Sequence, residues 1–156
     1  MRKTAKILLV TVVMLGIAFF AGITAVVLLG ISLDKESKSF VDAAIPAIVS
    51  DWDVAEIRKR ASPEFDESAD YDDMQQLFDV LHGLGDLREY AGSTGESRIM
   101  VSIGRGIVIT AAYSASADFE FGSAEILISL IKHEGRWQIL DFDIAPAETE
   151  MQKDII

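Results

Sequence analysis

Apolar and polar residues alternate along the last third of the chain, and the alternation predicts three consecutive β-strands. The runs cover residues 107–121, 122–133 and 136–144, and β-branched and aromatic residues dominate them. Short turn sequences separate the runs at residues 121–123 and 133–136. Because short turns join antiparallel neighbours, we expect a meander in which each strand pairs with the next.

The middle and last runs carry apolar side chains on both faces. In residues 124–131 one face is wholly apolar and the other is half polar, so this strand is predicted to be central and covered on both sides. In the last run Trp137 and Ile139 share one parity, whereas the opposite parity holds Leu140, Phe142 and Ile144. This change predicts a β-bulge, or burial of both faces, near Leu140.

The N-terminal stretch is predicted to be a membrane anchor. Residues 7–33 form a run of 27 residues without a charge, preceded by Arg2, Lys3 and Lys6. About 20 apolar residues span a bilayer, whereas a cleavable signal has an apolar core of only about 7–15. The length favours an uncleaved transmembrane signal anchor over the alternative, a signal peptide whose removal leaves a secreted soluble protein. The positive-inside rule places the basic end, residues 1–6, in the cytoplasm and the domain outside it.

The chain between the anchor and these strands is predicted to hold two helices and two short strands. Residues 34–60 show helical spacing, which Pro46 either kinks or divides. An acidic loop over residues 66–73 precedes a second helix over residues 74–84. Short strands are expected at 87–90 and 97–103, with glycines at the turns. The result is an α+β domain over residues 34–146 and a tail over residues 147–156.

Composition and charge exclude several classes of function. The chain has no cysteine, which excludes disulfides, thiolate metal sites and a cysteine nucleophile. Its formal net charge is −11, and the residues beyond the anchor carry 11 basic and 25 acidic side chains, a net of −14. Such a surface does not suit phosphates, so no nucleic-acid partner is expected. Anionic headgroups repel the same charge, which predicts that the domain stands off the bilayer.

The order of two helices followed by an antiparallel sheet resembles the cystatin-like, cone-shaped α+β fold of the nuclear transport factor 2-like superfamily. The resemblance is carried by residues 52–53, 61–65 and 81–85, and by the spacing of Tyr113, Phe119, Gly122, Ala124, Gly135, Trp137 and Ile139. The chain is most similar to small membrane-anchored or secreted bacterial members. The resemblance implies helices packed on the concave face of a curved sheet, around a pocket that different members use for isomerisation, dehydration or ligand binding.

Aromatic residues are the candidates for lining such a pocket, namely Trp52, Tyr90, Tyr113 and Trp137. Packing between helix and sheet explains the two tryptophans better than ligand stacking does. An isomerase- or hydrolase-like enzyme would need a carboxylate beside a tyrosine, and the candidates are Asp118, Asp141 and Asp143. Asp141 and Asp143 flank Phe142 as solvent-facing residues do on a half-buried strand, so the pattern favours a non-enzymatic domain.

No metal site or cofactor is predicted. His82 lies near the end of a predicted helix and His133 lies in a turn, so both are expected at the surface. An EF-hand calcium loop needs a glycine and a terminal glutamate that are missing from the acidic run of Asp66, Glu67, Asp70, Asp72 and Asp73. Acids that precede a helix stabilise its N-terminus, which accounts for this run without calcium.

The sequence therefore favours a membrane-tethered extracytoplasmic domain that acts in protein interaction or assembly at the cell envelope, with an apolar pocket as a candidate site for a small ligand. In a Gram-negative cell the domain would be periplasmic. A homodimer through the outer face of the sheet is a second hypothesis. The apolar candidates for that face are Leu127, Ile131, Leu140 and Phe142.

Overall fold

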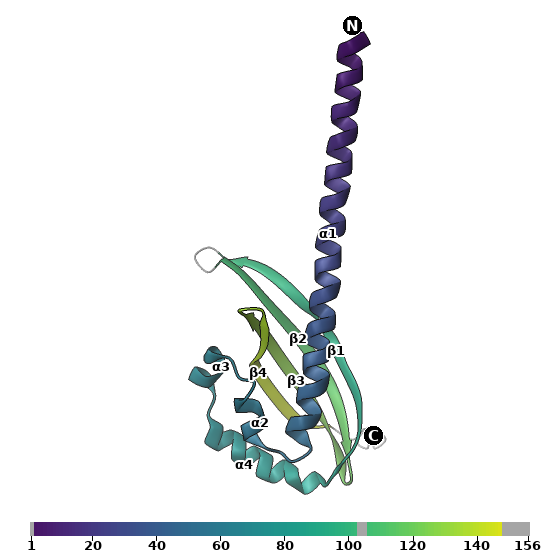
Figure 1. Ribbon diagram of the computed structural model, residues 1–156. Coiled ribbons are helices and arrows are strands. Elements are labelled where there is room, and N and C mark those ends of the chain that lie inside the picture. The colour runs from purple at the N-terminus through teal and green to yellow at the C-terminus, as the bar shows by residue number, and fades with distance from the viewer. Residues whose placement is uncertain (1, 103–105, 148–156) are drawn as a thin grey trace, which may run out of the picture. The chain divides into compact units, whose positions relative to one another are not determined.

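The computed structural model describes residues 2–102 and 106–147, and the side chains of residues 11–24, 27–101 and 106–147 (Figure 1). The chain divides into two compact units, Met1–Leu33 and Asp34–Ile156, and the division falls where the charge-free run ends. The predicted turn at residues 103–105 and the predicted tail beyond Ala147 lie outside the described residues.

The first unit belongs to helix α1, which covers Arg2–Val49. Within the described residues, α1 is the one helix that is long and apolar enough to cross a membrane. Its described side chains from Thr11 to Leu29 are exposed, and nearly all of them are apolar. A helix of this kind is consistent with membrane association.

In the second unit, the predicted helix over residues 34–60 is two helices. α1 continues through Pro46 and ends at Val49, so of the two alternatives for Pro46 the start of a new helix is wrong. The buried stripe of Val41, Ile45 and Ile48 holds this part of α1 against the sheet despite the missing proline N–H. Trp52 then adopts a left-handed backbone conformation with φ of 50°, which ends the first helix and turns the chain into α2, Val54–Arg58.

Two further helices replace most of the predicted acidic loop. α3 covers Pro63–Ser68, because the Ser62 hydroxyl accepts a hydrogen bond from Phe65 N at 3.2 Å and Pro63 suits the first turn. α4 covers Tyr71–Leu81, three residues earlier than predicted, and a short 3₁₀ helix η1, His82–Leu84, follows it. The Asp70 carboxylate caps α4 by accepting from the N–H groups of residues 72 and 73 at 3.0 and 3.1 Å. The predicted role of the acidic run at a helix N-terminus is therefore confirmed at Asp70.

The described part of the sheet has four antiparallel strands in the order β1-β2-β3-β4, so the predicted meander is confirmed. The strands are β1 Leu87–Ser102, β2 Gly106–Phe119, β3 Gly122–His133 and β4 Arg136–Pro146. The two short strands predicted before β2 are one strand with an irregularity between Tyr90 and Ser93. Gly95, predicted in a turn, pairs with Tyr113 inside this strand, where an added Cβ would lie 2.0 Å from the Ala112 carbonyl oxygen.

The parity change in β4 has the predicted cause. Ser129 pairs with Asp141 and Leu130 pairs with Ile139, so Leu140 is the extra residue of a β-bulge. The bulge directs Trp137 and Ile139 before it, and Phe142 and Ile144 after it, to the same buried face. The predicted inner position of β3 in the sheet is confirmed, but its second face is covered only in part, because Leu127 is exposed and Ile131 is buried.

The helices cover one face of the curved sheet and form the core with it (Figure 1). Trp52 lies at the centre of an aromatic group, with its ring 5.1 Å from Phe119 and 5.6 Å from Phe78. Phe78 of α4 in turn meets Phe142 of β4 at 6.4 Å. The inner face of the sheet, the face toward the helices, is therefore a packed core.

Candidate functional site

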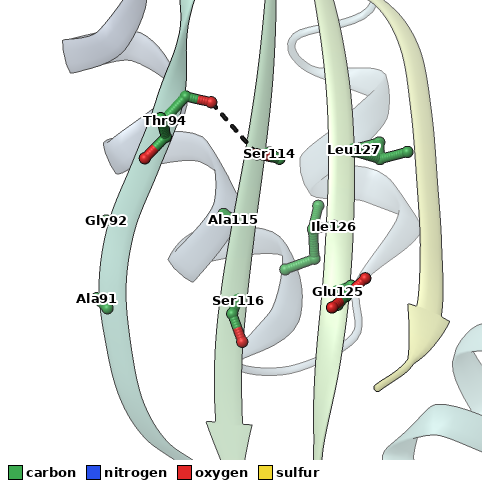
Figure 2. A pocket seen from close by; sticks show the side chains of 9 residues that line it. All are labelled: Ala91, Gly92, Thr94, Ser114, Ala115, Ser116, Glu125, Ile126 and Leu127. Carbon is green, nitrogen blue, oxygen red and sulfur yellow. Dashed lines mark hydrogen bonds between the residues drawn. The ribbon is translucent and has the colours of Figure 1, made fainter. Parts of the chain in front are cut away.

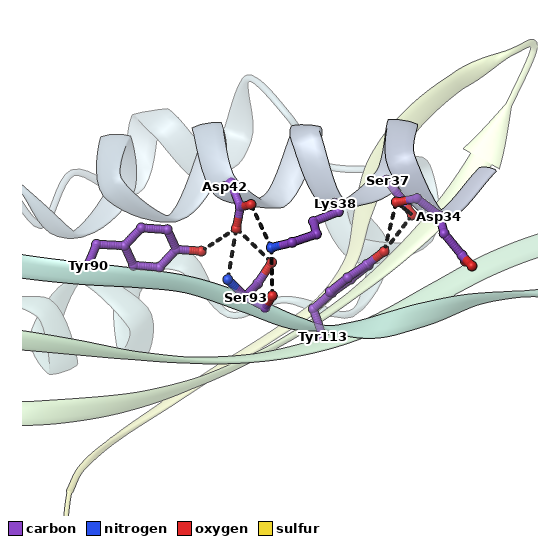
Figure 3. A network of polar contacts seen from close by, with 7 residues as sticks. All are labelled: Asp34, Ser37, Lys38, Asp42, Tyr90, Ser93 and Tyr113. Atoms are coloured by element: carbon purple, nitrogen blue, oxygen red, sulfur yellow. Dashed lines mark hydrogen bonds and ion pairs between the residues drawn. The ribbon is translucent and has the colours of Figure 1, made fainter. Parts of the chain in front are cut away.

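The two tyrosines of the predicted pocket lie in one polar seam between α1 and the sheet (Figure 3). We use the name polar seam for Asp34, Ser37, Lys38 and Asp42 of α1 together with Tyr90, Ser93, Ser97 and Tyr113 of the sheet. The α1 residues recur at helical spacing and so face the same strands. Trp52 and Trp137 do not belong to the seam but lie in the core.

Asp42 is the centre of the seam. Its Oδ1 accepts hydrogen bonds from the Tyr90 hydroxyl at 2.9 Å, from Ser93 N at 2.8 Å and from Ser93 Oγ at 2.7 Å. Its Oδ2 accepts from Lys38 Nζ at 2.8 Å, and Lys38 also donates to the Ser93 carbonyl oxygen at 2.6 Å. Asp42 therefore joins α1 to β1 through Oδ1, while Oδ2 holds Lys38 of the same helix, which in turn reaches Ser93 of β1.

A second group in the seam surrounds Tyr113. The Tyr113 hydroxyl lies 2.8 Å from Ser37 Oγ and donates to the Asp34 carbonyl oxygen at 3.2 Å. The Asp34 carboxylate accepts from Ser97 N at 2.7 Å and from Ser97 Oγ at 2.5 Å. Ser37 and Tyr113 are almost completely buried, so these hydrogen bonds satisfy polar groups inside the core.

The electrostatics of the seam hold the Asp42 carboxylate in its charged form. Burial acts to raise the pKa of Asp42, but hydrogen bonds from Lys38, Ser93 and Tyr90 outweigh burial and lower this pKa to about 2. Burial raises the pKa of Tyr90, and the hydrogen bond to Asp42 raises it further. Burial also raises the pKa of Tyr113. The seam therefore contains an ionised carboxylate and two neutral phenols at neutral pH.

The carboxylates predicted beside the tyrosines lie elsewhere. Asp118 is exposed and accepts from Ser123 Oγ at 2.6 Å, and Asp141 and Asp143 are exposed on the outer face of the sheet. Of the two predicted tyrosines, Tyr90 does meet a carboxylate, that of Asp42, which sequence reasoning missed. Its spacing from Asp34 and Lys38 on one helical face was the available signal, but the sequence does not say which face meets the sheet.

The tryptophans are core residues. Trp52 and Trp137 are 3% and 8% exposed, and the indole Nε1 of each is buried without a hydrogen-bond partner among the described residues. Lys132 of β3 pairs with Trp137 of β4, and its Nζ lies 5.3 Å from the centre of the Trp137 ring. Burial of both indoles fits the packing explanation that the sequence favoured.

The two histidines and the acidic residues form no metal centre within the described ranges. His133 Nε2 lies 3.0 Å from Glu64 Oε1, which makes a partly exposed contact between β3 and α3. The Glu64 pKa is lowered by a hydrogen bond from its own backbone N–H and by His133. His82 is exposed at the C-terminal end of α4, as predicted.

The outer face of the sheet, opposite the helices, carries a hollow of about 430 Å³ (Figure 2). Small side chains line it for the most part, and the lining consists of Ala91, Gly92, Thr94, Ser114, Ala115, Ser116, Glu125, Ile126 and Leu127. A second hollow of about 230 Å³ lies between α4 and β4, with Phe78 and Phe142 in its lining. Neither lining contains Asp42 or Tyr90.

Comparisons with protein-family models, with curated proteins and with solved structures find no match to this chain. The resemblance to the nuclear transport factor 2-like superfamily stays a prediction from the residues named above. At the coarser level, the fold is an α+β arrangement of helices on a curved antiparallel sheet, preceded by a long apolar helix.

Proposed function

We propose that this chain is a single-pass membrane protein in which residues 7–33 anchor a non-enzymatic interaction domain, residues 34–146, at the extracytoplasmic face of the cell membrane. The apolar length of α1 and the basic residues before the charge-free run support the anchor and its orientation. The resemblance to the nuclear transport factor 2-like superfamily would supply the type of fold without an activity.

The observation that carries the non-enzymatic proposal is the filled interior of the domain. Where a cone-shaped fold would hold a substrate, the described side chains pack against one another, and the inner face is 3% exposed or less at Trp52, Phe78, Ile126, Ile128 and Leu130. A packed interior of this kind contributes stability. The hollow of about 230 Å³ between α4 and β4 is smaller than the roughly 300 Å³ at which ligand pockets begin, so it does not suit a substrate of ordinary size. Binding is therefore proposed for the outer surface.

The tyrosine–carboxylate pair of the seam supports the same proposal. A general base works best when its pKa is near the working pH, and a pKa of about 2 makes Asp42 a very weak base at neutral pH. Its oxygens are already occupied by Lys38, Tyr90 and Ser93. These contacts suit a fastening between helix and strand better than an isomerase or hydrolase site.

The outer face of the sheet is the proposed partner surface. It combines the 430 Å³ hollow with exposed acids at Asp118, Glu125, Asp141 and Asp143. An envelope protein that presents basic and polar groups would complement this charge. A homodimer through this face would need exposed apolar side chains. Of the four predicted for it, Leu127 is exposed and Leu140 is half-buried, whereas Ile131 and Phe142 are buried. Two acidic faces also repel each other, so a partner protein fits this face better than a second copy.

A site-specific crosslink tests the partner surface. Because the chain has no cysteine, Ser116→Cys allows a photo-crosslinker to be attached at one position in the hollow, and Val80→Cys on exposed α4 is the control. We expect the full chain in its own membranes to crosslink to one other protein from position 116 and not from position 80. Glu125→Lys should abolish the crosslink, whereas Glu134→Lys in the β3–β4 turn should not.

Three outcomes would contradict the proposal. Equal crosslinking from positions 80 and 116 would remove the outer face as the partner surface. A product that contains only two copies of this chain would favour the homodimer. A catalytic activity that Tyr90→Phe abolishes without loss of stability would favour the enzyme.

A further inference from the structure

The hairpin between β1 and β2 is apolar beyond the point where the other strands end. β2 pairs with β3 only from Thr110 onward, so its first residues pair with β1 alone. Three successive cross-strand pairs in this part consist entirely of apolar residues: Ile99 with Ile109, Met100 with Val108, and Val101 with Ile107. Figure 1 shows that these two strands project past β3 and β4.

We call residues 99–101 and 107–109 the apolar hairpin. The side chains at its outer end are unusually exposed for their type, with Val101 81%, Ile107 70% and Met100 51% exposed, whereas those of residues 108 and 109 are half-buried. Single exposed apolar residues are common on soluble domains, but a contiguous group marks a surface that meets something else. A two-stranded ribbon also gains little stability from such residues by itself. The apolar hairpin therefore needs an occupant on its surface.

The apolar hairpin lies at the end of the domain where the charge-free run joins it. Asp42 of α1 meets Ser93 of β1, and Asp34 meets Ser97, so α1 and β1 run antiparallel. A step along α1 toward its N-terminus, from Asp42 to Asp34, therefore corresponds to a step along β1 toward its C-terminus. The apolar hairpin is the continuation of β1 in that direction. The last residue of the charge-free run, Leu33, directly precedes Asp34.

The charge pattern of this region also differs from that of the rest of the domain. Residues 97–117 contain no acid and two arginines, whereas residues 34–156 carry a net charge of −14. Of the two arginines, Arg98 is exposed, and its Nη2 lies 3.0 Å from Glu96 Oε1. The repulsion between the domain and anionic headgroups is therefore weakest along this hairpin.

The dimensions allow the apolar hairpin to reach lipid. From Ser97 to Val101 the strand advances about 13 Å. A helix made of the 27 charge-free residues is about 40 Å long, which exceeds the hydrocarbon core by about 10 Å. The length of the apolar hairpin is therefore of the same order as the excess of the helix over the hydrocarbon core.

We propose that the apolar hairpin inserts into the outer leaflet of the same bilayer that residues 7–33 span. The inference rests on the proposed membrane anchor, and it adds a second attachment point at the membrane surface. Insertion buries the three apolar pairs at the boundary between headgroups and acyl chains, where affinity rises with the apolar area buried. With two attachment points the domain cannot turn freely about the anchor, so its outer face keeps one orientation relative to the membrane.

Depth-dependent fluorescence quenching tests the insertion. The chain has no cysteine, so Val101→Cys carries a single environment-sensitive fluorophore. Phe121→Cys is the matched control, because Phe121 is also apolar and 77% exposed but lies in the β2–β3 turn at the other end of β2. Both labelled full-length proteins are placed in vesicles of phosphatidylcholine and phosphatidylglycerol, with or without a nitroxide on the acyl chains. Near-ultraviolet circular dichroism of the two buried tryptophans verifies folding.

We expect blue-shifted emission and quenching by the nitroxide at position 101, and neither at position 121. Adding Ile107→Asp to the protein labelled at position 101 should lower the equilibrium constant for insertion about tenfold, equivalent to about 1.4 kcal/mol. Equal emission and quenching at the two positions would overturn the proposal. So would a blue shift at position 101 that the nitroxide does not quench and that grows with the ratio of protein to lipid, because a second copy would then cover the hairpin.

Flotation of the same vesicles at alkaline pH separates this inference from the proposed anchor. Protein that floats while position 101 stays in water would refute the hairpin insertion and leave the anchor standing. Protein that does not float would refute the anchor as well.

Discussion

Replacing Asp42 with asparagine tests the energetic role of the polar seam. The substitution keeps the shape of the side chain but removes the charge that accepts from Lys38, Tyr90 and Ser93. The amide NH₂ group of asparagine also takes the place of the carboxylate oxygen that accepts from Lys38, so two donors then face each other. The replacement should therefore weaken the attachment of α1 to β1 without leaving a cavity.

The magnitude follows from the pKa of the carboxyl group. A lowering from 3.8 to about 2 corresponds to about 2.4 kcal/mol if the unfolded carboxyl group titrates normally. The Asp42 side chain is 33% exposed, so solvent screening reduces the expected loss to about 1–2 kcal/mol. Because the folded pKa is lowered, this contribution is complete above pH 4 and disappears as the pH falls through about 2.

Urea denaturation of the full chain in a mild detergent measures this loss, because Trp52 and Trp137 both lie in the second unit and report its unfolding by fluorescence. Asp141→Asn, on the exposed outer face, is the control and should change the free energy of unfolding by less than about 0.5 kcal/mol. A loss in Asp42→Asn that matches the control at pH 7, or that stays constant down to pH 2, would show that the reasoning about the charged carboxylate is wrong.

Three further predictions concern the anchor and the core. The full chain should fractionate with membranes at its full length, and a chain without residues 1–33 should be a soluble folded domain; recovery of a soluble product shortened by about thirty residues would contradict the anchor. Trp137→Ala should lower the free energy of unfolding by about 3–5 kcal/mol, and a loss below about 1 kcal/mol in denaturant would place this side chain outside the core. Gly95→Ala should cost about 3 kcal/mol or more or prevent folding, because its Cβ would lie 2.0 Å from the Ala112 carbonyl oxygen. Gly83→Ala, with nothing within 4 Å, should change stability little, and similar losses in the two glycine variants would contradict this explanation.

The sheet after residue 107 was predictable because local patterns decide it. Alternation gave the strands, short turns gave the meander, and the parity change gave the bulge at Leu140. β1 was not predictable in one piece, because its glycines indicate turns in the sequence. In the structure Gly95 instead allows a close approach to the neighbouring strand, which depends on residues 17 and 18 positions away.

The polar seam was not predictable for a related reason. Asp42 is one of 25 acids, and nothing local separates it from the solvated ones. Its role depends on Ser93, which lies 51 residues later in the chain. Trp52 and Trp137 were predictable as core residues because large aromatics are buried almost wherever a helix packs on a sheet. Tyr90 and Tyr113 were predicted to line a pocket or to lie beside carboxylates of the strands, whereas their hydrogen-bond partners come from α1.

The polar seam also closes one edge of the sheet. Ser93 and Ser97 lie on the edge strand β1, and the carboxylates of α1 take their outward N–H groups, while Lys38 takes the Ser93 carbonyl oxygen. At the opposite edge, residues 60–62 pair with Ile139 of β4 through hydrogen bonds of 2.7 and 2.8 Å. An unpaired edge is where another chain adds a strand or where aggregation begins. Along these stretches a partner cannot extend the sheet, so assembly must use side chains on a face, and loss of Asp34 or Asp42 would reopen a template for aggregation.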